Sequence, residues 1–261
     1  MTPMRPALVA LLVLVGCAGP WNPLDDGLEA KTLRMERWVR VDDDGTTAVF
    51  APRAVRAEVA GSWLALARSA RREVASWFGE PLSGRLEVHL VDRFPDGFEA
   101  DGFSNAARLF VRCNPDAAPK SADRDLVAHE IVHVFLAQGW KIKRPYWFEE
   151  GLATYIEGER LGYGVAGKSL LGDVVGLDMV DTAQLRFENL HTWPPRLSYR
   201  LAAVAVETAL TRWGKARLVS LGGQTGSFED AWALTFGEMP TLLEERWRDA
   251  VRIEQRRRTR R

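Results

Sequence analysis

The chain reads HEIVH at residues 129–133. A capping residue at 121 or 123 and a glycine after residue 138 predict a helix around this stretch. Positions four apart lie on one face of a helix, so His129 and His133 can converge on one cation while Glu130 stands beside the open coordination position. The chain has four histidines, and two of them are in this motif, which therefore predicts a metal site. Two helix histidines satisfied by neighbouring groups are the alternative for so short a motif.

A catalytic zinc ion takes a third protein ligand and keeps its fourth position for water. The stretch WFEEGLATY, residues 147–155, lies at the start of the next predicted helix and contains two adjacent carboxylates, Glu149 and Glu150. Both fall in the first helical turn, about 100° apart around the helix axis. Position alone therefore leaves both open as the third ligand.

With these two stretches the chain resembles the gluzincins, the thermolysin-like MA clan of zinc metallopeptidases, and its bacterial MA-like members in particular. In one branch of the clan the third ligand directly precedes a glycine, so the resemblance implies Glu150 as the third ligand beside His129 and His133. It implies one zinc ion per chain and Glu130 as the catalytic base. Glu149 is then an acidic residue favoured by the helix N-terminus.

The same resemblance implies an oxyanion donor from a tyrosine at the start of a helix beyond the active-site loop. Tyr199 has this placement, so we expect it to act as that donor. His191, Tyr155 and Arg200 are the alternatives.

The chain also departs from the thermolysin pattern. Thr154 stands four positions after Glu150, where that pattern has an aspartate that would orient the zinc histidines. Glu157 and Asp125 are the candidates for this orienting role, and the sequence leaves the choice between them open.

The first residues predict export. Arg5 precedes an apolar run at residues 7–15 that is too short to span a bilayer. The sequence LVGC at residues 14–17 resembles the bacterial lipobox, which implies lipidation of Cys17 and a lipid-anchored membrane protein of the bacterial cell envelope, facing the periplasm or the exterior. An ordinary signal peptide with an incidental cysteine is the alternative.

Strand and helix signals along the chain predict an α+β fold. The resemblance implies a zincin-like fold with a small N-terminal mixed sheet, active-site helices and a helical C-terminal lobe. Residues 108–112 are the strand that we expect to pair with an extended peptide substrate, and a sheet edge protected by its arginines is the alternative. The expected organisation is a lipoprotein signal peptide at 1–17, a flexible tether at 18–30, a metallopeptidase domain at 31–252 with an α+β lobe at 31–139 and a helical lobe at 145–252, and a basic tail at 253–261.

Composition limits the partners. Lysine plus arginine equal aspartate plus glutamate at 35 each, so the overall charge favours no nucleic-acid partner, and no oligomer is implied. The combined expectation is a zinc-dependent metallopeptidase that is anchored in the cell envelope and acts on a peptide or protein. A non-catalytic zinc-binding envelope lipoprotein and a zinc amide hydrolase acting on peptidoglycan are the alternatives.

Overall fold

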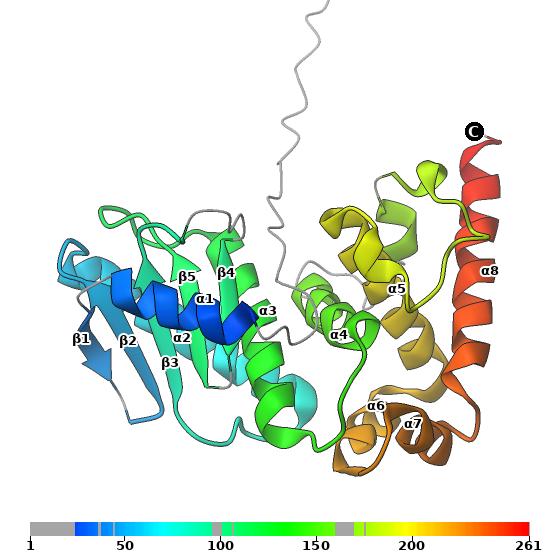
Figure 1. Ribbon diagram of the computed structural model, residues 1–261, viewed down its shortest axis with the longest axis horizontal. Helices are drawn as coiled ribbons and strands as arrows, with labels where there is room; N and C mark the ends of the chain where they lie inside the picture. Colours follow the sequence, from blue (N-terminus) through cyan, green and yellow to red (C-terminus); the bar gives the residue numbers. More distant parts are fainter. Residues whose placement is uncertain are drawn as a thin grey trace, which may run out of the picture.

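Among the described residues, a mixed sheet of five strands and a group of helices lie at opposite ends of the molecule (Figure 1). The predicted α+β class, with a small N-terminal mixed sheet and a helical C-terminal part, is confirmed. The computed structural model describes residues 24–35, 38–43, 45–95, 101–105, 107–159, 170–174 and 176–260. The predicted signal peptide and Cys17 lie outside these residues.

The sheet has the strand order β1-β2-β3-β5-β4. Its strands are β1 Trp38–Asp43, β2 Thr47–Pro52, β3 Leu86–Val91, β4 Gly102–Asn105 and β5 Arg108–Arg112. The three central strands are parallel, and β1 and β4 pair antiparallel at the two edges. The middle strand, β3, is almost entirely buried, as expected for a parallel strand that is covered on both faces.

The prediction that residues 108–112 form a sheet edge is wrong. These residues are β5, which pairs with β3 on one side and with β4 on the other. The backbone N–H and C=O groups on both sides of β5 therefore already take part in sheet pairing. The short strand β4 takes the edge position. A sequence pattern reveals the strand but not its neighbours, because pairing is a long-range property.

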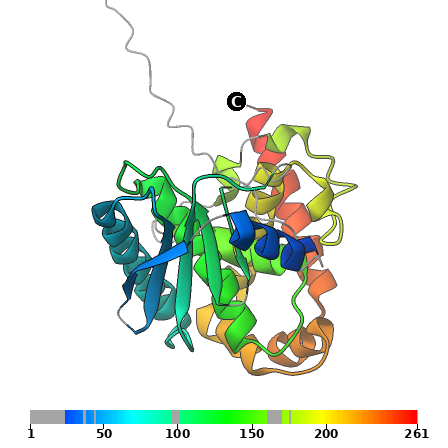
Figure 2. The same cartoon turned by 60° about the vertical axis from the view of Figure 1, so that its left-hand side comes forward.

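Helices cover both faces of the sheet and build the other end of the molecule (Figures 1 and 2). They are α1 Leu24–Met35, α2 Ala57–Phe78, α3 Ser121–Gly139, α4 Tyr146–Glu159, α5 Pro195–Trp213, α6 Lys215–Ser220, α7 Phe228–Phe236 and α8 Pro240–Arg258, with short 3-10 turns η1 Leu170–Asp173, η2 Leu177–Met179, η3 Leu190–Thr192 and η4 Leu221–Gly223. Alternate residues of β5 point to opposite faces. Leu109 and Val111 join the main core with α2, whereas Phe110 joins a smaller cluster against which Leu28 and Leu33 of α1 pack.

The predicted tether is wrong for residues 24–30, because they belong to α1. Leu28 and Leu33 pack on the aromatic cluster of the sheet, and Glu29 forms an ion pair with Arg108 and accepts a hydrogen bond from the Asn105 amide. These contacts come from strands about 80 residues later in the chain. They offset the entropy of ordering a segment whose composition favours a flexible linker.

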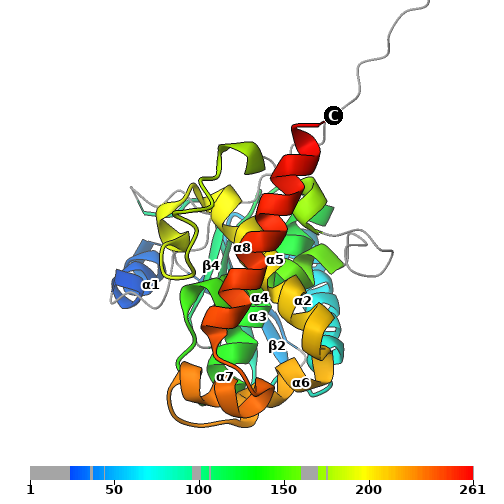
Figure 3. The same ribbon diagram turned by 90° about the vertical axis from the view of Figure 1, so that its right-hand side faces the viewer.

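The predicted boundary of the basic tail is also wrong. Helix α8 continues without a break to Arg258 and runs along the outer side of α5 (Figure 3). The Arg258 guanidinium donates hydrogen bonds to the carbonyl oxygens of Leu171, Gly172 and Val174, at 3.1, 2.8 and 2.8 Å. Those contacts hold the last turn of α8 in place.

The smaller cluster contains a buried histidine. The ring of His89 stacks between Phe50 and Phe110, with centroids 4.7 and 4.9 Å away. Its two nitrogens have no hydrogen-bond partner among the described residues, and the Glu87 carboxylate lies 3.6 Å from Nε2. Burial lowers the pKa of His89 below its ordinary value of 6.5, although Glu87 acts in the opposite direction.

We predict that His89→Phe reduces the sensitivity of the fold to acid. The unfolded chain binds the His89 proton more tightly than the folded one, so this histidine lowers the free energy of unfolding as the pH falls through and below 6.5. Phenylalanine keeps the ring stack and takes no proton. Urea unfolding at about pH 8 and at about pH 5 should give a smaller difference for the variant than for the parent protein. An equal difference in both proteins would contradict the prediction.

Candidate metal centre

Helix α3 lies between the two ends of the molecule and contributes two residues of the site. At its N-terminus the Asp123 carboxylate accepts a hydrogen bond from the backbone N–H of Lys120 at 2.6 Å. The helix contacts α2 and β4 in the N-terminal part and α4 in the helical part, which buries nearly all of its sides. His129 and His133 therefore project from a rigid element.

Three side chains meet at one point between α3 and α4. The Nε2 atoms of His129 and His133 are 3.3 Å apart. Glu150 Oε2 lies 3.4 Å from His129 Nε2 and 3.6 Å from His133 Nε2. Zinc bonds of about 2.0–2.1 Å in tetrahedral geometry separate neighbouring ligand atoms by about 3.3–3.4 Å, so the three donors fit a single zinc ion.

Glu149 and Glu150 point to different partners. Arg144 donates a hydrogen bond from Nε to Glu149 Oε1 at 2.7 Å and also donates to the carbonyl oxygen of Ile142 at 2.8 Å. Glu150 is buried in the cluster with the two histidines. Arg144 was not among the predicted site residues, although a basic residue five positions before Glu149 was a signal for this ion pair.

The glycine after Glu150 allows α4 to approach α5 closely. A Cβ atom on Gly151 would lie 2.5 Å from the carbonyl oxygen of Ala202 and 3.0 Å from a methyl group of Val206. No side chain fits at that distance from another backbone. The glycine thus sets the distance between α4 and α5, and with it the position of Glu150.

We predict that Gly151→Ala weakens both the fold and the metal site. The added methyl must push α4 away from α5, which lowers the free energy of unfolding by about 1–3 kcal/mol and moves Glu150 away from the histidines. Urea unfolding and zinc titration measure the two effects. Gly61→Ala is the matched control, because Gly61 lies inside α2 with nothing within 4 Å of its added methyl. Equal results for the two variants would contradict the prediction.

The electrostatics of the cluster favour the charged form of Glu150. Burial alone raises the pKa of its carboxyl group, but the contacts with His133 and His129 outweigh burial and bring the pKa down to about 2. A carboxylate is the form that binds a metal ion.

A fourth side chain lies beside one of the histidines. Glu157 Oε2 lies 3.3 Å from His129 Nδ1, on the side of the ring opposite the cluster, and both side chains are buried. Glu157 thus occupies the orienting position that the sequence left open between it and Asp125. Glu150 and Glu157 are seven residues apart, about two turns, so their shared face of α4 was the available signal.

We predict that Glu157→Gln lowers zinc affinity by about 10–100-fold, the range known for outer partners of zinc histidines. The amide can still contact His129 Nδ1 but no longer supplies the negative charge that makes the imidazole a stronger donor. Competition with a fluorescent zinc chelator measures the affinity. Parent-like affinity in both Glu157→Gln and Glu157→Ala would show that the contact does not support the metal.

Tyr199 lies beside the cluster. It follows Pro195 in the first turns of α5, is buried, and has its ring centroid 6.2 Å from that of His129. Next to it, the Tyr146 hydroxyl and the Ser198 hydroxyl are 3.1 Å apart, which joins the start of α4 to the start of α5.

The alternatives to Tyr199 lie in other surroundings. His191 is exposed and has its ring centroid 6.3 Å from that of Tyr146. Tyr155 is buried within α4, and Arg200 is partly buried on α5.

Comparison with known proteins bears on the fold. No family model matches the chain, and a search of curated proteins finds no match. Among solved structures, the M1 zinc metallopeptidase from Deinococcus radiodurans is similar, with a TM-score of 0.51 and 16% sequence identity. A mutant of that enzyme gives a TM-score of 0.52 and 15% identity. Each match covers 81% of this chain and 50% of the other, so the chain spans about half the length of these structures. The likeness shows a metallopeptidase-like fold.

Proposed function

We propose that this protein is a zinc-dependent hydrolase of peptide bonds. The observation that carries the proposal is the convergence of His129, His133 and Glu150, whose ligand atoms all lie within 4.8 Å of one another. The similar fold of zinc metallopeptidases supports the proposal. Glu130, adjacent to the first ligand and buried, supplies the base that such chemistry requires.

Each residue has a defined role in the proposed reaction. His129, His133 and Glu150 would hold zinc, which when bound lowers the pKa of a water molecule to about 7. The Glu130 carboxylate accepts a proton from the attacking water as the water oxygen bonds to the substrate carbonyl carbon, and it passes that proton to the nitrogen as the carbon–nitrogen bond breaks. Tyr199 donates a hydrogen bond from its hydroxyl to the substrate carbonyl oxygen as negative charge develops there. An extended substrate would add to β4, the edge strand that contacts α3.

The donor set favours catalysis over a purely structural role. Structural zinc sites are usually closed by four protein ligands, whereas catalytic sites have three and keep one position for water. Among the described residues the candidate group contains two histidines and one glutamate. The adjacent Glu130 has no function in a structural site.

A peptide library tests the proposal across many substrate sequences at once. We expect the zinc-loaded protein to generate new amino termini, detected by mass spectrometry, and expect chelation to stop cleavage and added zinc to restore it. Muropeptides digested in parallel test hydrolysis of peptidoglycan stem amides. Cleavage of muropeptides alone would replace the proposed substrate class. A zinc-loaded protein that cleaves neither would favour the non-catalytic zinc-binding alternative.

We also propose that Cys17 carries a lipid that anchors the protein in the cell envelope. The support is the LVGC sequence at residues 14–17 after an apolar run. Within the part of the chain that the structure describes, every helix is too short or too polar to be a membrane span. Metabolic labelling with a fatty acid should mark the parent protein and not Cys17→Ser; equal labelling would refute the anchor.

A further inference from the structure

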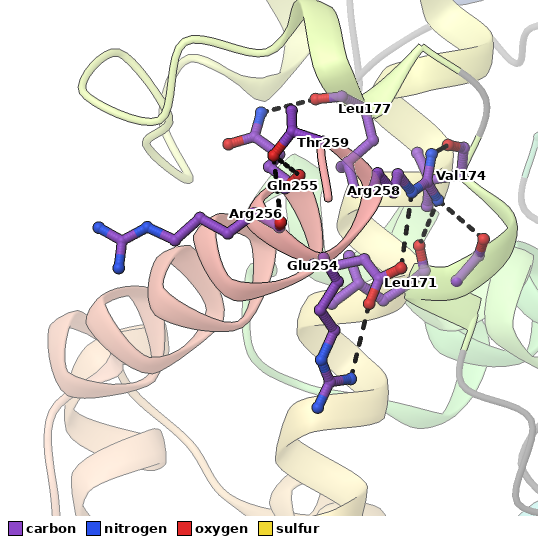
Figure 4. Close-up of polar contacts among 10 residues, drawn as sticks. Leu171, Val174, Leu177, Glu254, Gln255, Arg256, Arg258 and Thr259 are labelled. Carbon is purple, nitrogen blue, oxygen red and sulfur yellow. Dashed lines mark hydrogen bonds and ion pairs between the residues drawn. The ribbon is translucent and has the colours of Figure 1, made fainter. Parts of the chain in front are cut away.

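Positive charge is concentrated at the end of α8. Residues 252–260 contain five arginines and one glutamate, in a chain whose formal net charge is zero. Arg258 is directed inward and binds the carbonyl oxygens of the η1 region (Figure 4). The other four arginines are exposed.

Three of the exposed arginines form a stripe. Arg252 and Arg256 are four residues apart and lie on one side of α8, and Arg260 follows at the same spacing in the turn after the helix. Arg252 forms an ion pair with Asp249 at 2.7 Å. Arg256 extends away from the protein (Figure 4) and has no acidic partner among the described residues.

Exposed apolar groups accompany the stripe. Ile253 on α8 is 53% exposed, and Met179 on η2 is 75% exposed. Gln255 donates hydrogen bonds from Nε2 to the carbonyl oxygens of Leu177 and Val180, at 2.7 and 2.8 Å, which fixes η2 against the helix. A hollow of about 550 Å³ between η1 and α8 also opens here, and its lining combines the apolar Leu171, Ala250 and Ile253 with the charged Asp173, Glu254 and Arg257.

We propose that this face, defined as Arg252, Ile253, Arg256, Arg260 and Met179, docks on the anionic headgroups of a lipid bilayer. The positively charged arginines are attracted to the negative surface potential of an anionic membrane. The two apolar side chains can enter the boundary between headgroups and acyl chains, which a nucleic-acid backbone does not offer. The contacts of Gln255 and Arg258 hold the face rigid, so docking orders little new structure. This inference depends neither on the metal centre nor on Cys17.

Vesicle sedimentation tests it with the full chain carrying Cys17→Ser, so that no lipid anchor contributes. We expect stronger binding to vesicles of phosphatidylcholine with phosphatidylglycerol than to phosphatidylcholine alone. Arg252→Gln, Arg256→Gln and Arg260→Gln together should weaken binding to the anionic vesicles at least about tenfold. The same three positions changed to lysine should retain binding, and Ile253→Ser with Met179→Ser should weaken it.

The matched control neutralises three other exposed arginines, Arg53, Arg72 and Arg93. It removes the same total charge from the N-terminal part, so it should retain most of the anionic-vesicle binding. Equal loss in the two triple variants, or equal binding to both kinds of vesicle, would overturn the proposal. Binding of a DNA duplex that depends on the same arginines and not on Ile253 would also overturn it, because the face would then be a general polyanion site. Thermal unfolding by circular dichroism verifies that each variant is folded.

Discussion

Glu150→Gln is expected to bind zinc at least about 100-fold more weakly than the parent protein, whereas Glu149→Gln binds it equally well. Glu150 lies within 3.6 Å of both histidine Nε2 atoms, so its replacement removes a negatively charged ligand. Glu149 is held by Arg144 outside the cluster. The two variants are a matched pair, because adjacent residues of one helix lose the same charge.

Zinc per chain measured by elemental mass spectrometry, followed by competition with a chelator, distinguishes these variants. We expect near one zinc ion in the parent protein and in Glu149→Gln, and little in Glu150→Gln or in His133→Ala. The reverse order for the two glutamates would assign the third ligand to Glu149. Absence of zinc in the parent protein after supplementation would refute the metal centre itself.

Glu130→Gln is expected to retain zinc and to lose hydrolysis by about 10²–10⁴-fold, the range for a general base. Glutamine has nearly the same size and shape, so the buried site keeps its packing, but an amide cannot accept the proton of the attacking water. The measurement combines zinc content with the rate of cleavage of the best peptide from the library. This variant separates a catalytic site from a site that only binds metal.

Two outcomes would contradict the role of Glu130. A variant that keeps both zinc and the parent rate would mean that another group removes the proton. A variant that loses zinc would give Glu130 a part in the metal site, and its loss of activity would then say nothing about proton transfer. Glu188→Gln, an exposed carboxylate replaced in the same way, is a control for the substitution.

The part of the metal centre that the sequence predicted follows from local periodicity. His129 and His133 are separated by about one helical turn, and any helix that contains them brings their side chains to one face. The α+β class also followed from local signals, since apolar spacing distinguishes strands from helices within a few residues. In both cases the interacting residues are near one another in the chain.

The choice of Glu150 over Glu149 was open by position, and only the resemblance to a known family favoured it. In the structure the packing of α4 against α5 decides the orientation, through the contact between Gly151 and the backbone of Ala202. The role of Glu157 also depends on packing that its position in the sequence does not reveal. Its spacing from Glu150 placed it on the right face of α4, but its contact with His129 depends on where α3 lies.

Three further features were decided by contacts between distant segments. Residues 24–30 fold because α1 meets the aromatic face of the sheet, β5 is internal because β4 pairs with it, and the end of α8 is ordered because Arg258 reaches the carbonyl groups near residue 172. Composition described each segment correctly as polar, charged or strand-like. The sequence by itself thus determined the helical spacing of the histidines and the class of the fold. The tertiary structure decided which carboxylate joins the histidines, which strand lies at the sheet edge and which terminal segments are ordered. Those outcomes depend on packing energies between segments far apart in the chain.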